Sequence, residues 1–96
     1  MYYKLSKSYR PDKKFMVITP ENKSIHFGAK NYSDFTIHKD EKRKMNYISR
    51  HTPNEDWTDL SKAGTWSRYI LWNKPTLIGS VRDMEKQFKI KIKLSL

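Results

Sequence analysis

The three histidines are the residues of this chain that could most readily take part in catalysis or metal binding. His26, His38 and His51 lie 12 and 13 residues apart, so none has the i, i+3 or i, i+4 spacing of a helix-borne metal pair. His26 falls in an expected strand and His51 at an expected helix end, where a histidine commonly caps the helix or lies on the surface. The sequence therefore predicts no metal site, no cofactor and no catalytic residue.

The segment that starts at His51 supports one enzymatic alternative. It reads His-Thr-Pro-Asn-Glu-Asp and follows an expected hairpin and helix, which is the outline of a ββα-metal nuclease. In that architecture the metal ligands lie on the hairpin and helix, whereas Glu55, Asp56 and Asp59 follow the helix in a loop. These acidic residues are more typical of helix caps or partners of basic faces. A small metal-dependent nuclease using His51 or His26 is kept as a second alternative.

A positive signal comes from basic residues interleaved with aromatic ones. Lysine and arginine neutralise phosphates and release counterions, while exposed tyrosines can stack on bases. The candidate nucleic-acid-binding residues are Lys4, Lys7, Arg10, Lys13, Lys14, Tyr32, Lys42, Arg43, Lys44, Tyr47 and Arg50. Tyr9 joins Tyr32 and Tyr47 as a candidate for base stacking. Such basic surface can equally be a solvated face, or can dock on an acidic protein.

The composition agrees with a folded, strongly basic domain. The chain has 96 residues, with 20 Lys plus Arg against 10 Asp plus Glu and a formal net charge of +10. This length predicts a single domain over residues 1–96, and an aromatic content of 14% predicts a folded chain. Cysteine is absent, which excludes disulfides and thiolate zinc sites. The longest apolar stretches are three or four residues, so we expect no membrane span and no secretion.

In the first half of the chain, a hairpin and a helix are expected to position the basic clusters. Residues 1–12 are interpreted as a flexible basic arm or an edge strand. Residues 13–28 predict a β-hairpin around a four-residue turn that begins at Pro20. Loop chemistry then runs to Phe35, and Asp40 caps a helix that extends to about Arg50. Met45 and Ile48 give this helix only a narrow apolar stripe, so we expect it to be mostly solvated.

The second half is expected to supply most of the core. Residues 65–73 predict a short buried helix that carries tryptophan, and residues 77–88 predict a helix capped by Thr76. Residues 89–95 alternate lysine with aliphatic residues, which is typical of a strand with one buried face. The expected fold class is α+β, with a small antiparallel sheet of the hairpin and the C-terminal strand packed against two to three short helices. The predicted core comprises Phe15, Val17, Ile25, Phe27, Trp66, Ile70, Leu77, Val81, Met84, Phe88, Ile90 and Ile92.

Three blocks of the sequence resemble a known family. They run from Arg10 to Pro20, from Ile25 to Phe35 and from Trp66 to Leu77. Together they are similar to a family of small uncharacterised basic proteins encoded by giant viruses, the nucleocytoplasmic large DNA viruses. The resemblance implies a viral product located in the virion or in the infected host cell interior. It brings no activity and no catalytic residue.

These observations lead to one expected function and two alternatives. We expect a non-enzymatic, virion-associated protein that binds nucleic acid, DNA more than RNA, through phosphate contacts with little sequence preference. The first alternative is a minor capsid or cement protein, in which the same cations meet acidic capsid proteins. The second is the metal-dependent nuclease described above. The sequence leaves the oligomeric state open.

Overall fold

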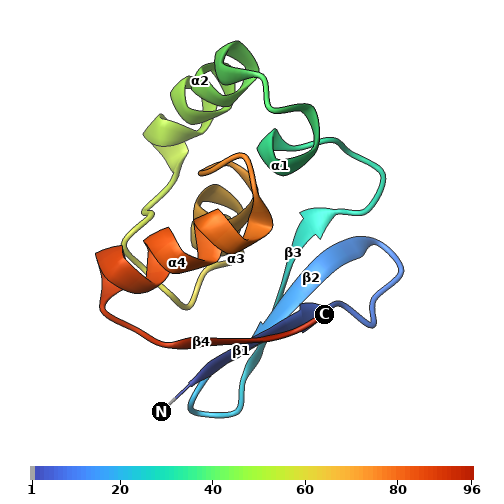
Figure 1. Ribbon diagram of the computed structural model, residues 1–96, viewed down its shortest axis with the longest axis vertical. Helices are drawn as coiled ribbons and strands as arrows, with labels where there is room; N and C mark the ends of the chain where they lie inside the picture. Colours follow the sequence, from blue (N-terminus) through green and yellow to red (C-terminus); the bar gives the residue numbers. More distant parts are fainter. Residues whose placement is uncertain (1) are drawn as a thin grey trace.

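A four-stranded mixed sheet is the base of the fold in the computed structural model, which describes residues 2–96. The strand order is β3-β2-β1-β4, and β4 runs parallel to β1 while the other pairs are antiparallel (Figure 1). The strand bounds are β1 Tyr3–Lys7, β2 Lys13–Ile18, β3 Ser24–Ala29 and β4 Ile92–Ser95. The α+β class and the hairpin are thereby confirmed, but the expectation of a fully antiparallel sheet was wrong.

The basic N-terminal segment holds an inner strand of the sheet. β1 pairs with β2 on one side and with β4 on the other, and Leu5 lies opposite both Val17 and Leu94. Leu5 has no solvent exposure, so it anchors this strand in the core. The expectation of an arm or an edge strand over residues 1–12 was wrong for β1, because the lysines around Leu5 obscure its period-two pattern. The two edge strands are β4, beside β1, and β3, at the opposite end of the sheet.

The helices lie on one side of this sheet, with α3 and α4 nearer to it and α2 farthest away (Figure 1). α1 and α2 follow β3, and a 3-10 turn, η1, ends α2. α3 continues directly into a π-helical turn, η2, before α4 begins. The bounds are α1 Phe35–His38, α2 Glu41–His51, η1 Thr52–Asn54, α3 Ala63–Trp66, η2 Ser67–Leu71 and α4 Leu77–Phe88.

Local capping fixes where the two longer helices begin. The Asp40 carboxylate accepts from the backbone N–H groups of Lys42 and Arg43 at the start of α2, and the Thr76 hydroxyl accepts from Gly79 N–H at the start of α4. Both predicted caps are confirmed. Lys89 then ends α4 with a φ of 54°, and the chain becomes a strand only at Ile92. The C-terminal strand is therefore shorter than residues 89–95.

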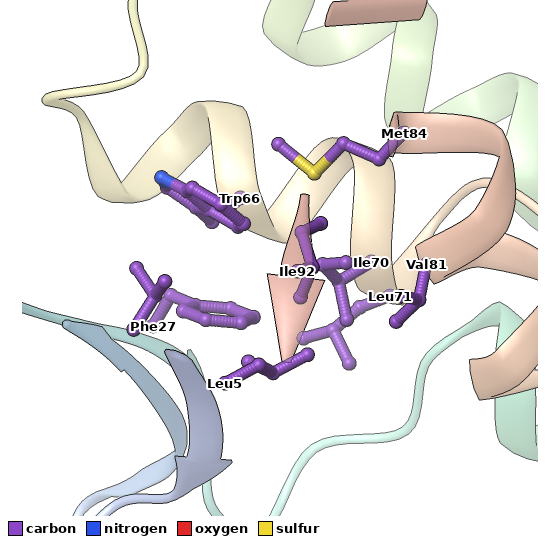
Figure 2. Close-up of a cluster of buried hydrophobic side chains, with 9 residues drawn as sticks. Leu5, Phe27, Trp66, Ile70, Leu71, Val81, Met84 and Ile92 are labelled. Carbon is purple, nitrogen blue, oxygen red and sulfur yellow. The ribbon is translucent and has the colours of Figure 1, made fainter. Parts of the chain in front are cut away.

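The core lies between the sheet and the layer formed by α3, η2 and α4. Figure 2 shows Leu5, Phe27 and Ile92 from the strands facing Trp66, Ile70 and Met84 from the helices. The indole of Trp66 is completely buried, and its Nε1 donates to the Leu60 carbonyl at 3.0 Å. The buried set is Leu5, Val17, Phe27, Trp66, Ile70, Leu71, Val81, Met84 and Ile92. The predicted core residues outside this set lie half-buried at its rim, namely Phe15, Ile25, Leu77, Phe88 and Ile90.

Candidate nucleic-acid interface

A cleft of about 580 Å³ opens between the end of the β2–β3 hairpin, α2 and η2. We call it the basic cleft. Its volume lies in the range of small-molecule sites. Its lining residues are Lys13, Lys14, Gly28, Ala29, Tyr32, Ser33, Asp34, Arg43, Tyr47, Arg50, His51, Ser67, Leu71 and Trp72. The fold thus brings Lys13 and Lys14 of the hairpin to the same cleft as Arg43 and Arg50 of α2, which lie 29 to 37 positions further along the chain.

The helix α2 supplies one wall of the basic cleft. Arg43, Tyr47 and Arg50 follow the i, i+4, i+7 spacing of one helix face. α2 has no fully buried residue, and its half-buried positions are Lys44, Tyr47, Ile48 and His51. Met45, expected as part of the inward apolar stripe, is 60% exposed. That expectation was wrong because contacts of aromatic and lysine side chains, more than aliphatic ones, determine which side of α2 faces the rest of the domain.

Aromatic stacking holds that wall in place. The Tyr47 ring stacks on Trp72 with centroids 4.3 Å apart and planes 4° from parallel, and the His51 ring lies 4.3 Å away on Tyr47 at 31°. The Tyr47 ring is thus already in contact with two other aromatic rings. Burial raises the pKa of the Tyr47 hydroxyl to about 12, and the Glu55 carboxylate adds to this shift. Tyr47 lines the basic cleft, but its ring is half-buried against Trp72 and His51. Its stacking role on nucleic acid stays a prediction.

One lysine of the basic cleft is neutralised within the protein. Lys14 Nζ lies 2.5 Å from Asp34 Oδ2, and their side chains are only 12% and 3% exposed. The other oxygen of Asp34 accepts hydrogen bonds from the backbone N–H and the hydroxyl of Thr36, so Asp34 also caps the N-terminus of α1. In the described residues 2–96, the cleft cations Lys13, Arg43 and Arg50 take part in no ion pair. These three side chains are the ones available to an anion.

The other predicted basic residues lie outside the basic cleft. Lys44 donates to the Asn73 carbonyl at 2.6 Å and covers the Phe35 ring at 4.9 Å, so its ammonium joins α2 to the body. Arg10 pairs with Asp12 on the surface. Lys4 pairs in register with Lys93 of β4. Neither Lys7, which ends β1, nor Lys42, on α2, lines the cleft.

Tyr32 and Tyr9 present the most exposed tyrosine rings among those predicted to stack. Each is 74% exposed. Tyr32 lines the basic cleft, whereas Tyr9 does not line it and packs edge to face with His26, with ring centroids 4.7 Å apart. Tyr32 is therefore the exposed stacking candidate that the structure places beside the free cations.

His38 and His51 lie at the two ends of one aromatic cluster that runs through Trp72 and Tyr47, and His26 lies elsewhere. His26 Nδ1 shares a 2.7 Å hydrogen bond with the Ser8 hydroxyl. His38 Nδ1 accepts from the Asp40 N–H at 3.0 Å, and its ring lies 5.4 Å from that of Trp72. His51 stacks on Tyr47. Over residues 2–96, His, Asp and Glu side chains form no group of three that could hold a metal ion.

The acidic residues after α2 make local contacts. Hydrogen bonds from Thr58 lower the pKa of Asp56, and hydrogen bonds from Ser61 lower that of Asp59. The Glu55 carboxylate lies against Gly64 in α3, where a side chain would collide with it. Asp56 and Asp59 thus accept hydrogen bonds within their own turns. The expectation that this segment caps the next helix was wrong, because α3 begins after Lys62 without a side-chain cap.

Sequence reasoning missed the floor of the basic cleft. The π-helical turn η2 brings Ser67, Leu71 and Trp72 to it, and Gly28 opens the space beside Leu71. A Cβ on Gly28 would lie 2.8 Å from Leu71 Cδ1, and the φ of Gly28 is +80°. The glycine in an expected strand was the available signal, since such a glycine often marks close approach of another group. π-Helical turns also recur at functional sites.

The fold and the cleft define a small α+β domain with a cationic surface groove. The chain belongs to a family of unknown function, DUF5754, whose model matches residues 3–51. That range runs from β1 to the end of α2 and contains the free cleft cations and Tyr32. No curated protein and no solved structure matches the chain. No helix within residues 2–96 has the length and apolar character needed to cross a bilayer.

Proposed function

We propose that this protein is a non-enzymatic module that binds nucleic acid through phosphate contacts with little sequence preference. The observation that carries the proposal is that Lys13, Arg43 and Arg50 line one cleft and form no ion pair with an acidic residue within residues 2–96. Phosphate contacts made by such cations supply most of the affinity of non-specific binding. The net charge of +10 adds a long-range attraction to any polyanion.

A second feature separates this cleft from ordinary basic surface. Its cations stand on two different walls, the hairpin end and α2, so an anion inside it meets charge from more than one side. A concave site with low-dielectric walls strengthens such contacts relative to a flat surface. DNA, with one charge per phosphate, is the polyanion we expect to use it.

A salt titration of variants tests the proposal. Lys13→Gln, Arg43→Gln and Arg50→Gln are combined in one cleft variant, and Lys62→Gln, Arg82→Gln and Lys86→Gln in a control variant that loses the same charge. The three control residues are exposed and lie outside the cleft. Binding to labelled oligonucleotides is measured between about 50 and about 200 mM salt, over which non-specific binding falls steeply.

The cleft variant is expected to lose most of its affinity, and its salt slope should fall by about 2 for single strands, at about 0.7 per lost phosphate contact. The control variant should keep a slope near that of the wild type. Equal losses in both variants would show that net charge, not the cleft, attracts the nucleic acid. Absence of wild-type binding at about 50 mM salt would remove the proposal. Tight, salt-sensitive capture of an acidic protein instead would favour the capsid or cement alternative.

The biological setting follows from resemblance alone. The similarity to giant-virus proteins suggests that the nucleic acid is a viral genome or transcript and that the protein accompanies it in the virion. The family match carries neither an organism nor an activity. Location is a direct test, because a genome-bound component leaves the particle with its DNA, whereas a cement protein stays with the emptied capsid.

A further inference from the structure

We propose that the basic cleft is a site for single-stranded nucleic acid, in which Tyr32 stacks on an unpaired base while Lys13, Arg43 and Arg50 hold the backbone. This inference rests on the proposed function and specifies the substrate class of the same site. It combines an exposed aromatic ring and unpaired cations within one concave surface.

Tyr32 has the properties of a stacking residue. Its side chain is 74% exposed although it lines the cleft, whereas Tyr47, another lining residue, is half-buried and already in contact with the Trp72 and His51 rings. Tyr32 follows β3 in the segment that leads to α1, and its backbone N–H donates to the Ala29 carbonyl at 3.2 Å. The backbone is thus tied to the end of the hairpin while the ring stays open to solvent. Any base can stack on such a ring, so sequence preference is not required.

The spacing of the cleft cations matches the spacing of phosphates along a nucleic-acid strand. Arg43 and Arg50 are two helical turns apart on the cleft face of α2, which places their Cα atoms about 10 Å apart along the axis. At about 3.4 Å per stacked nucleotide, that distance covers about three nucleotides. Lys13 faces them from the hairpin end. A strand that lies along α2 can therefore contact both arginines and turn one base toward the hairpin side, where Tyr32 lies.

A duplex does not match this arrangement. It is stiff on the scale of this domain, with a persistence length of about 150 base pairs, and its bases are paired inside it. Stacking on Tyr32 would require flipping a base out, which costs a few kcal/mol. Duplex DNA nevertheless has the higher charge density and is favoured by electrostatics alone. A preference for the single strand is therefore a signature of base stacking and not of charge.

The experiment compares two single strands that differ in bases but not in charge, together with a duplex of higher charge density. Affinities are measured by fluorescence anisotropy for an oligothymidine, an abasic oligonucleotide of equal length and a blunt duplex, at one salt concentration. The variants are Tyr32→Ala, Tyr32→Phe and Tyr9→Ala. Tyr9 is the matched control, because it is equally exposed at 74% but lies outside the cleft.

Tyr32→Ala is expected to weaken oligothymidine binding about tenfold, the usual effect of losing one stacked base, and to leave the abasic strand unaffected. Tyr32→Phe should retain the wild-type affinity because the ring remains, and Tyr9→Ala should match the wild type. Equal wild-type affinity for oligothymidine and abasic strand, or equal losses on both in Tyr32→Ala, would overturn the inference. If the Lys13, Arg43 and Arg50 variant still loses binding in that case, the proposed function stands and only the substrate class fails. No binding to any of the three ligands would overturn both.

Discussion

Tyr47 stacks face to face on Trp72, with ring centroids 4.3 Å apart and planes 4° from parallel. Tyr47 belongs to α2 and Trp72 follows η2 directly, so the stack joins the α2 wall of the basic cleft to its floor. α2 contributes no buried residue, and its other firm attachment is the hydrogen bond from Lys44 Nζ to the Asn73 carbonyl. This pair of contacts therefore sets the position of Arg43 and Arg50.

Replacing Tyr47 with alanine is expected to loosen α2 before the rest of the domain. Loss of the stack and of the apolar area it covers should lower the free energy of unfolding by about 1–3 kcal/mol. Urea unfolding measures the loss in the free energy of unfolding of the whole domain. Amide hydrogen exchange should be faster in α2 than in the sheet. Met45→Ala is the control on the same helix, since Met45 is 60% exposed and its loss should cost about 0.5 kcal/mol or less. Unchanged exchange in α2 would contradict the assigned role of the stack.

The raised pKa of Tyr47 predicts a loss of stability in alkali. Burial, with a smaller contribution from Glu55, raises this pKa from 10.0 to about 12 in the folded protein. Below pH 10 the hydroxyl is protonated in both states and its stabilising effect is complete. Between about pH 10 and about pH 12 the unfolded chain ionises first, so the free energy of unfolding falls. Urea midpoints across this window should decrease more for the wild type than for Tyr47→Phe, and identical alkaline slopes would refute the prediction.

Features that depend on neighbouring residues, such as helix caps, could be predicted from the sequence. The pairing of strands that are far apart in the chain could not. Asp40 and Thr76 act as expected because a cap depends on neighbours within one helical turn. The place of β1 could not be derived in the same way, since its parallel partner β4 lies at the other end of the chain. Leu5 is the one fully buried residue of that strand, and a single apolar position among lysines carries little pattern.

At the candidate site, too, the sequence predicted local features and missed those that depend on distant residues. The sequence identified Arg43 and Arg50 as exposed cations on a solvated helix, and both line the cleft. It could not show that Lys14 is neutralised, because the partner Asp34 is twenty residues away and is reached only after the hairpin folds. Nor could it separate the free ring of Tyr32 from the half-buried ring of Tyr47, since that difference depends on Trp72 in a distant segment.

The two ion pairs among the described residues should differ sharply in importance. Asp34→Asn leaves the ammonium of Lys14, only 12% exposed, without its counter-charge, and breaking a buried pair in this way typically costs about 3–5 kcal/mol. Asp12→Asn breaks the pair with Arg10, whose side chains are 48% and 59% exposed, and should cost about 1 kcal/mol or less. Urea unfolding of both variants checks the contrast, which equal destabilisation would contradict. A Lys14→Met, Asp34→Asn double variant should recover part of the loss, because no unpaired charge is then buried.

Gly28→Ala is expected to destabilise the floor of the basic cleft. The added Cβ would lie 2.8 Å from Leu71 Cδ1, and the φ of +80° is one that L side chains rarely adopt, so the two effects together should cost about 1–3 kcal/mol. A double-mutant cycle with Leu71→Ala separates them. In the Leu71→Ala background the contact is gone, and the cost of Gly28→Ala should shrink to the backbone term of about 1–2 kcal/mol. Urea unfolding measures all four proteins, and an unchanged cost in both backgrounds would show that the contact with Leu71 is not what requires glycine at this position.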